Sequence, residues 1–238
     1  MARADGVQTI NSRITNRRRQ LRRTVVATAA VVAGLAVSLS IDRPILDLLP
    51  VLHHSVNLPT NDWIGLGRLM GFAPTWIVVG VALLLVDRAE AIVGEPSYLK
   101  YRRLTLLLSS AALGGLAAEA LKIVARRERP AADATEHVFR SITDRPFYGG
   151  GLGLPSGHAA TAAAALYCMW RFFPSAAPVW ITLMIGCGLS RLADGSHFVS
   201  DVYCGAIVGV VTASLIWVND DRKRGRRTSD PSLLHIAA

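Results

Sequence analysis

Six apolar runs, each close to the length that crosses a lipid bilayer, limit what this chain can fold into. The runs cover residues 24–41, 72–86, 104–121, 157–173, 177–193 and 201–218. A helix needs about 20 apolar residues to span the hydrocarbon, and the runs are somewhat shorter. Because backbone polar groups inside a bilayer must bond within their own segment, we expect an all-α, polytopic membrane helix bundle with six transmembrane helices. The mean hydropathy of +0.35 agrees with a membrane protein.

The runs divide the chain into three parts. A basic N-terminal segment covers residues 1–23, a six-helix membrane domain covers 24–219, and a charged tail covers 220–238. The first run follows basic residues, as in a signal peptide. It is longer than the usual apolar core of about 7–15 residues, so we expect an uncleaved anchor. All three cysteines lie inside runs as small apolar residues, and neither a disulfide nor a metal site is expected.

The positions of Lys and Arg predict the orientation in the membrane. Seven basic residues precede the first run, four lie between the second and third runs, and five follow the last run. Cytoplasmic segments carry an excess of Lys and Arg, so these three segments are predicted to be cytoplasmic. Both termini then lie in the cytoplasm, and a bacterial inner membrane is the expected location.

One region opposes this charge bias. The connection between the third and fourth runs, which includes the long loop 130–154, lies outside in the predicted topology. It carries six basic residues: Lys122, Arg126, Arg127, Arg129, Arg140 and Arg145. Basic residues are unusual in a translocated loop, so they need another reason to be there. Phosphate binding is one such reason.

Three of these cations share one helical face. Lys122, Arg126 and Arg129 are spaced four and three apart, and they would repel one another unless an anion lay among them. A basic collar at the membrane surface is the alternative. We favour a phosphate clamp for Lys122 and Arg129, whereas Arg126 and Arg127 fit either role. Glu119, one turn before Lys122, is expected to be a structural partner for a cation.

A second cluster begins the fourth run with Pro155, Ser156, Gly157 and His158. The first N–H groups of a helix are unpaired and lie at the positive end of its dipole, so this turn could bind an anion. In the alternative interpretation Ser156 only caps the helix and His158 lies at the membrane interface.

A third cluster joins the last two runs and contains Ser190, Arg191, His197 and Asp201. His197 and Asp201 are four apart, so on a helical turn the carboxylate can hold one imidazole nitrogen and direct the other at a target. Arg191 offers a planar charged fork for phosphate oxygens, Ser190 could donate one more hydrogen bond, and Asp194 could orient Arg191. All three clusters reach the outer face in the predicted topology.

Together the clusters resemble the type 2 phosphatidic acid phosphatase family, which shares its site with vanadium-dependent haloperoxidases. The family pattern is Lys-x6-Arg-Pro, Pro-Ser-Gly-His and Ser-Arg-x5-His-x3-Asp. This chain matches each motif without a gap, in the same order, between Lys122 and Asp201. The resemblance covers roughly residues 72–218. The loop between the first two motifs is long for the family, which leaves the choice of substrate open.

The resemblance implies a mechanism. His197 would attack phosphorus to form a phosphohistidine, Asp201 would hold its tautomer, and His158 would protonate the leaving oxygen and later activate water. Six further groups would bind the phosphoryl oxygens: Lys122, Arg129, Ser156, Gly157, Ser190 and Arg191. Fixed cations would take the role of a metal ion, so neither a metal nor another cofactor is expected.

The expected function is hydrolysis of a lipid phosphate or diphosphate at the outer membrane face. Isoprenyl diphosphate, phosphatidic acid, phosphatidylglycerol phosphate and a lipid A phosphate all fit. The expected partners are the bilayer and the lipid phosphate, with no nucleic acid. Transfer of the phosphoryl group to another lipid is an alternative. A haloperoxidase is disfavoured because those enzymes are soluble, and a non-enzymatic lipid-binding protein is disfavoured because the catalytic set is complete.

Overall fold

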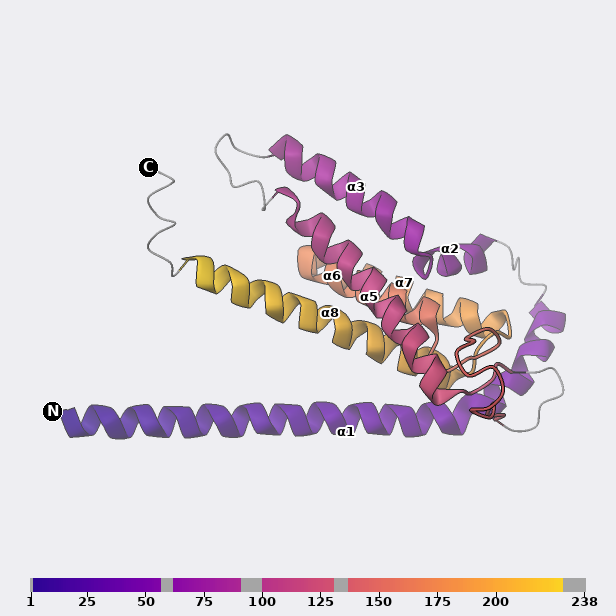
Figure 1. The fold of residues 1–238 in the computed structure, drawn as a ribbon, viewed down its shortest axis with the longest axis horizontal. Coiled ribbons are helices and arrows are strands. Elements are labelled where there is room, and N and C mark those ends of the chain that lie inside the picture. Colours follow the sequence, from indigo (N-terminus) through magenta and orange to yellow (C-terminus); the bar gives the residue numbers. More distant parts are fainter. Residues whose placement is uncertain (1, 57–61, 91–99, 131–136, 229–238) are drawn as a thin grey trace. The chain divides into compact units, whose positions relative to one another are not determined.

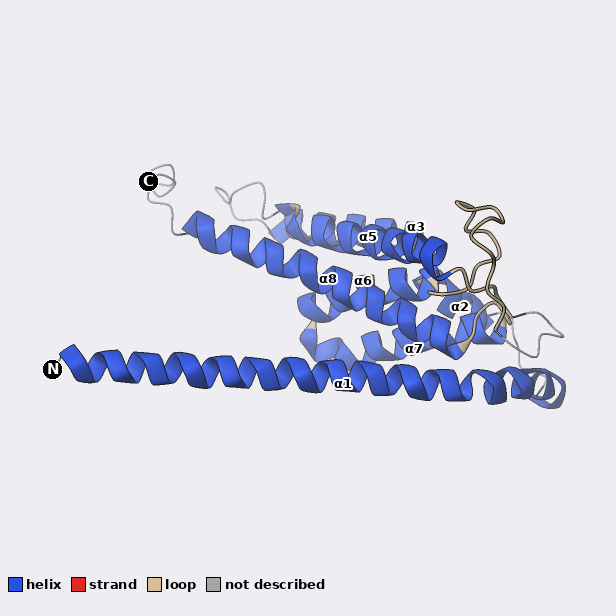
Figure 2. Cartoon of the chain, turned by 60° about the horizontal axis from the view of Figure 1, so that its bottom comes forward, coloured by secondary structure: helices blue, strands red, loops and turns tan. Residues whose placement is uncertain are grey.

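The computed structural model describes residues 2–56, 62–90, 100–130 and 137–228. These described residues form seven α-helices, labelled as in Figure 1, and a short 3-10 helix, Pro174–Ala176, before α7. The α-helices are α1 (Ala2–Val56), α2 (Asp62–Met70), α3 (Ala73–Glu90), α5 (Arg102–Ala125), α6 (Gly157–Phe172), α7 (Ala177–Ala193) and α8 (Val199–Thr228). The described residues form no strand, only two isolated β-bridges, so the all-α prediction is confirmed (Figure 2).

The chain divides into two compact units. The first unit, Met1–Ser40, is the N-terminal part of α1, and its apolar side chains such as Leu21 and Val32 are exposed. The second unit, Ile41–Ala238, begins within the same helix and contains all the other elements.

Each predicted apolar run coincides with a helix, and only Phe72 and Phe173 at the ends of two runs lie outside one, but the predicted count of six spans is only partly supported. Among the described residues, four helices are long and apolar enough to cross a membrane: Arg17–Leu48, Arg102–Ala125, Pro174–Ala193 and Val199–Gly225. The pair α2 and α3 makes a fifth if it is taken as one span bent by 69°. At 16 residues, α6 is too short to count alone. The chain is an integral membrane protein built from several apolar helices.

Helix α6 is the central element of the second unit. It packs against α5, α7 and α8, as Figures 1 and 2 show, and its alanines from Ala159 to Ala165 are buried. The helices approach closely because glycines face α6. A Cβ on Gly209 of α8 would lie 2.2 Å from the carbonyl oxygen of Ala160, and one on Gly114 of α5 would lie 2.8 Å from Cβ of Ala164. Small residues at helix contacts are typical of membrane bundles.

Large apolar side chains point outward from this bundle. Val78 of α3, Leu116 of α5, Ile181 of α7 and Leu215 of α8 are all more than half exposed. An apolar surface around a small-residue interior fits a bilayer environment and would aggregate in water.

Two predicted boundaries differ from the helix ends. Helix α1 already includes residues 2–23 of the predicted basic segment. The tail predicted from Asp220 begins inside α8, which continues to Thr228. Hydropathy marks where the bilayer ends, whereas Arg and Lys are good helix formers and continue the helix beyond it.

Candidate active site

The three sequence clusters meet at one end of the second unit. His158, in the first turn of α6, interacts electrostatically with Arg191 and His197 and with Lys122 of α5. Arg129 adds its charge to both Arg191 and His197. Residues from α5, α6, α7 and the turn before α8 thus converge, as the motif spacing predicted.

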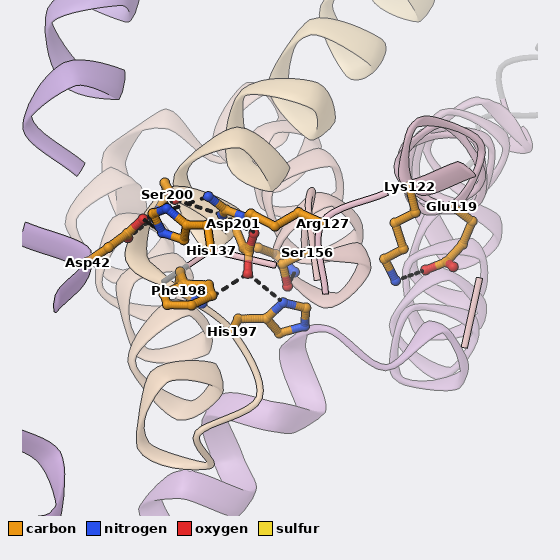
Figure 3. A network of polar contacts seen from close by, with 11 residues as sticks. Asp42, Glu119, Lys122, Arg127, His137, Ser156, His197, Phe198, Ser200 and Asp201 are labelled. Carbon is orange, nitrogen blue, oxygen red and sulfur yellow. Dashed lines mark hydrogen bonds and ion pairs between the residues drawn. The ribbon is translucent and has the colours of Figure 1, made fainter. Parts of the chain in front are cut away.

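His197 lies in the turn between α7 and α8 and is almost completely buried. Its Nδ1 is 3.5 Å from Oδ2 of Asp201, which stands in the first turn of α8. The same Oδ2 accepts a hydrogen bond of 2.9 Å from the backbone N–H of Phe198. The carboxylate therefore faces the imidazole from a fixed position, as Figure 3 shows.

Burial lowers the pKa of His197 below its ordinary value of 6.5, because a charged imidazolium loses its hydration there. Asp201 opposes this effect, and the positive charges of Arg129 and Arg191 add to it. The imidazole is therefore neutral at neutral pH, which is the state of a nucleophile.

The second oxygen of Asp201 is held by Arg127. Nε of Arg127 donates to Oδ1 of Asp201 over 3.1 Å, and Nη2 donates to the same oxygen. Arg127 is fully buried, and its guanidinium lies 5.1 Å from the centre of the Phe198 ring. The sequence left a phosphate clamp and a basic collar open for Arg127, and the structure shows a third role, an internal ion pair with Asp201.

The Pro-Ser-Gly-His turn caps α6. Ser156 is the N-cap, and its Oγ accepts from the backbone N–H of Ala159 over 3.5 Å. The backbone N–H of Ser156 donates to the carbonyl oxygen of Asp201 over 2.9 Å, which ties this turn to α8. Gly157 is closely covered, because a Cβ there would lie 2.5 Å from Oε1 of Glu119. Capping and anion binding are thus compatible in one turn.

Lys122 is buried, and its Nζ donates to Oε1 of Glu119 over 2.6 Å. The prediction that Glu119 is a partner for a cation is confirmed. Glu119 reaches Gly157, so the carboxylate lies beside the turn where the phosphate is expected (Figure 3). A phosphoryl group would replace it as the anion nearest to Lys122.

Arg191 lies in the last turn of α7, and its Nη1 donates to Oδ2 of Asp194 over 2.7 Å. The expected orienting role of Asp194 is therefore consistent with the structure. Arg68 of α2 also donates to this oxygen, over 2.5 Å. Nε of Arg191 is buried and has no hydrogen-bond partner in the described part of the chain. That N–H is a donor that a phosphoryl oxygen could satisfy.

Ser190 is buried beside Arg191, and its hydroxyl donates to the carbonyl oxygen of Cys187 over 2.7 Å. A serine hydroxyl readily reaches a carbonyl of its own helix. Donation from Ser190 to a phosphate, which the sequence predicts, would require this hydroxyl to rotate away from Cys187.

Arg126 organises the outer loop. It is the left-handed C-cap residue of α5, and its guanidinium donates to the backbone carbonyl oxygens of Arg140, Ser141, Asp144 and Pro146. A buried arginine that is occupied by four carbonyls has few donors left for a ligand. Arg126 is therefore a structural residue.

The backbone of Arg129 is fixed by a hydrogen bond, whereas its side chain is exposed. Its N–H donates to the carbonyl oxygen of Gly151 over 3.0 Å. Two β-bridges, Arg127 with Phe139 and Glu128 with Leu152, join the segment after α5 to the loop. The loop thereby sets the position of Arg129 next to Arg191.

No group of three or more His, Cys, Asp and Glu residues with the geometry to hold a metal ion occurs within the described ranges. Apart from Asp201 beside His197, the charges that act on the two histidines are cations, among them Lys122, Arg129 and Arg191. The arrangement can bind an anion with several negative oxygens and present a neutral imidazole to it.

Comparison with known proteins identifies the family. Residues 103–224, half of the chain and all three motifs, match the PAP2 superfamily. The chain belongs to the PAP2 superfamily. Over 71 residues this PAP2 chain is 37% identical to the lipid A 1-phosphatase of Porphyromonas gingivalis, a match that covers 28% of this chain and 16% of that protein's length.

A solved PAP2 structure is also similar. It is a transmembrane PAP2-type phosphatidylglycerolphosphate phosphatase from Bacillus subtilis, at 18% identity and a TM-score of 0.36. The alignment covers 78% of this chain and 96% of that one.

The PAP2 motifs do not include four residues around this site that sequence reasoning missed: Asp42, Arg68, His137 and Ser200. One signal for Asp42 was present, because an acidic residue at the end of an apolar run is costly unless it is paired. Nothing in the sequence indicated its partners, which lie about a hundred or more residues away.

Proposed function

We propose that this PAP2 protein is a membrane phosphatase that hydrolyses a lipid phosphomonoester or diphosphate through a phosphohistidine. One observation carries the proposal: a buried His197, whose pKa is lowered by burial, faces the Asp201 carboxylate at 3.5 Å among the cations of Arg129, Arg191 and Lys122. A neutral imidazole among fixed cations suits attack on a phosphate ester, whose negative oxygens the cations would hold.

In the first step Nε2 of His197 attacks phosphorus, and the bond from phosphorus to the lipid oxygen breaks. His158 gives its proton to that oxygen, and a phosphohistidine remains. In the second step His158 takes a proton from water, the hydroxide attacks phosphorus, and the phosphorus–nitrogen bond breaks. Inorganic phosphate leaves and His197 is regenerated.

Fixed donors stabilise the negative charge in both steps. Lys122, Arg129 and Arg191 supply positive charge, and the backbone N–H of Gly157 and the hydroxyls of Ser156 and Ser190 complete the cradle. Arg191 has an unused buried N–H, which supports its place in this set. No metal ion or other cofactor is required by this mechanism.

We place the active site at the outer face of a bacterial inner membrane, with both termini in the cytoplasm and six membrane-spanning helices. The charge asymmetry of the loops supports this orientation. The short helix α6 would complete the six spans because it is surrounded by longer helices and need not contact lipid over its full length.

The substrate class is a phosphate on a membrane lipid. The site lies at the ends of apolar helices, so a headgroup at the interface would reach it while the acyl or isoprenyl tail stays in the bilayer. The relative from Porphyromonas gingivalis makes a lipid A phosphate one candidate, beside isoprenyl diphosphate, phosphatidic acid and phosphatidylglycerol phosphate.

A panel assay tests the proposal. Purified protein is incubated with each of these four lipids in mixed micelles, and released phosphate and the lipid products are both measured. We expect phosphate release from at least one lipid and none from the His197→Ala variant. Transfer of phosphate to an added lipid, without free phosphate, would instead indicate a phosphotransferase. No reaction with any lipid would contradict an enzymatic role.

A further inference from the structure

A buried carboxylate far from the motifs is connected to the nucleophile. Asp42, in the last part of α1, is 1% exposed. Its Oδ1 accepts from the backbone N–H of Ser200 over 2.8 Å, and its Oδ2 accepts from the hydroxyl of Ser200 over 2.5 Å. Oδ2 also lies 3.8 Å from Nη1 of Arg127 and 3.2 Å from Nε2 of His137.

We propose that Arg127 and Asp42 are positioning residues for His197, acting through Asp201. The inference rests on the proposed function, because it assigns these residues to the same nucleophile. Figure 3 shows the connected set, with Arg127 between the two carboxylates and Asp201 between Arg127 and His197.

The first step is geometric. Arg127 binds Oδ1 of Asp201 with Nε and Nη2, and this leaves Oδ2 for His197 and the Phe198 N–H. A guanidinium is a rigid planar fork, so it fixes the carboxylate plane in a way that a lysine could not. Nη2 also donates to the hydroxyl of Ser200 over 2.7 Å, and that hydroxyl in turn donates to Asp42.

The second step concerns charge. A single arginine paired with Asp201 alone would neutralise most of the field that Asp201 exerts on His197. Asp42 adds a second carboxylate on the other side of the same guanidinium, so the buried group of one cation and two carboxylates keeps one negative charge. In a poorly hydrated interior this charge acts on the two imidazoles that contact the group, His197 at Asp201 and the partly exposed His137 at Asp42.

This group is closed to solvent. Asp42, Arg127, Ser200 and Asp201 are each at most 2% exposed, and the ring of Phe198 packs 5.1 Å from the Arg127 guanidinium and 4.6 Å from the ring centre of His137. Buried charges that anchored helices only mechanically would need no link to the catalytic Asp201. The shared Ser200 hydroxyl supplies that link.

The test removes the negative charge of Asp42 with little change in the shape of its side chain. Asp42→Asn keeps an oxygen for the Ser200 N–H and loses the negative charge. With 4-nitrophenyl phosphate and full-length protein in detergent, we expect kcat to fall about 10- to 100-fold, the usual range for outer partners of catalytic groups. KM should stay within about twofold, because none of these residues belongs to the phosphate cradle.

The pH profile separates positioning from anchoring. His197 is faced by Asp201 of α8, Arg191 of α7, His158 of α6 and Arg129 of the outer segment, and all of these remain in the variant. Loss of a nearby negative charge makes the imidazolium less favourable, so the acid limb of kcat/KM should move to lower pH. Wild type and variant use the same substrate, so its own titration cancels in the comparison.

Asp87→Asn is the matched control. Asp87 of α3 pairs with Arg103 over 3.1 Å and is not part of the site, so its loss should leave kcat and the pH profile unchanged. If Asp42→Asn behaves like this control and only lowers the melting temperature, the inference is wrong. In that case the proposed function would still be upheld if the wild-type protein is active and the His197→Ala variant is not.

Ser200→Ala provides a second variant that keeps every charge. It removes the hydroxyl between Arg127 and Asp42, and we expect a smaller fall in kcat with unchanged KM. If Asp42→Asn does not fold, this variant decides: wild-type kcat in Ser200→Ala would overturn the inference, and a reduced kcat that Ser200→Thr restores would support it.

Discussion

The two histidines of the site have different surroundings, and this difference sets their chemistry. His197 has a carboxylate 3.5 Å from Nδ1, while His158 stands in the first turn of α6 beside the capping Ser156. A fixed tautomer suits a nucleophile. A place at the anion-binding turn suits a group that gives a proton to a departing oxygen.

Single replacements should separate these roles. His158→Ala should still form a phosphoenzyme with an activated aryl phosphate, whose leaving group needs little protonation. It should also accumulate acid-labile phosphohistidine, because water is no longer activated. Lipid phosphate turnover should fall about 10²- to 10⁴-fold, the range for positioned proton transfer. His197→Ala should form no phosphoenzyme with either substrate.

Quenched-flow trapping with ³²P-labelled substrate measures both variants. Their melting temperatures serve as the control for folding. A phosphoenzyme in His197→Ala together with none in His158→Ala would reverse the assignment.

At the residue scale, the sequence predicted contacts that lie close in the chain or follow a known spacing. His197 lies two residues before α8 and faces Asp201 in its first turn, and Lys122 is one turn after Glu119 in α5, so local geometry is enough to bring each pair together. Arg126 and Arg127 could not be separated in this way. One cation binds loop carbonyls and the other binds Asp201, and the choice depends on the left-handed backbone at Arg126, which turns the chain at the end of α5.

At the scale of elements, the contact of α8 with α6 is close because glycines on α8 face the backbone of α6. A methyl group on Gly209 would lie 2.2 Å from the carbonyl oxygen of Ala160, a distance that requires the helices to separate. One on Gly186 of α7 would meet no atom within 4 Å. These two positions form a natural pair for measuring the importance of close packing.

We expect Gly209→Ala to destabilise the protein by about 1–3 kcal/mol, the usual cost of overpacking, and to lower its melting temperature in detergent. Activity should fall as well, because α6 carries His158 at its N-terminus. Gly186→Ala should leave both unchanged or raise stability slightly, since alanine is the better helix former. Equal effects of the two substitutions on melting temperature and activity would show that close packing of α6 against α8 does not determine either property.

Apolar runs predicted where the helices are, but not where they end or bend. Helix α2 was missed because its nine residues include Asp62 and Arg68 and do not form an apolar run. The break between α2 and α3 turns the chain by 69°, which brings Arg68 to Asp194. That arrangement depends on contact with α7, which a local pattern does not contain.

At the scale of the whole molecule, the proposed orientation can be tested from outside the cell. Ile142 of the outer loop is 75% exposed, and Arg222 near the end of α8 lies on the opposite side in the proposed topology. Ile142→Cys should react with an impermeant thiol reagent in intact cells. Arg222→Cys should react only after lysis, and the opposite pattern would place the site in the cytoplasm.

Fixed cations also predict how the enzyme responds to chelators and to vanadate. EDTA should leave activity largely intact, because Lys122, Arg129 and Arg191 supply the charge. Vanadate should inhibit by occupying the phosphoryl site as a trigonal bipyramid, and Arg191→Ala should weaken this inhibition. Activity that EDTA abolishes and magnesium restores would contradict the mechanism.

The buried link between Asp42 and Asp201 has a consequence for biogenesis. Asp42 lies on α1, which leaves the ribosome before α5 and α8, Arg127 follows α5, and Asp201 arrives only with α8. Until α8 is inserted, Arg127 lacks its closest carboxylate and Asp42 lacks Ser200, and unpaired buried charges cost several kcal/mol each. Assembly of the site is therefore coupled to synthesis and insertion of α8, and a product truncated before α8 would keep unmatched charges at Asp42 and Arg127.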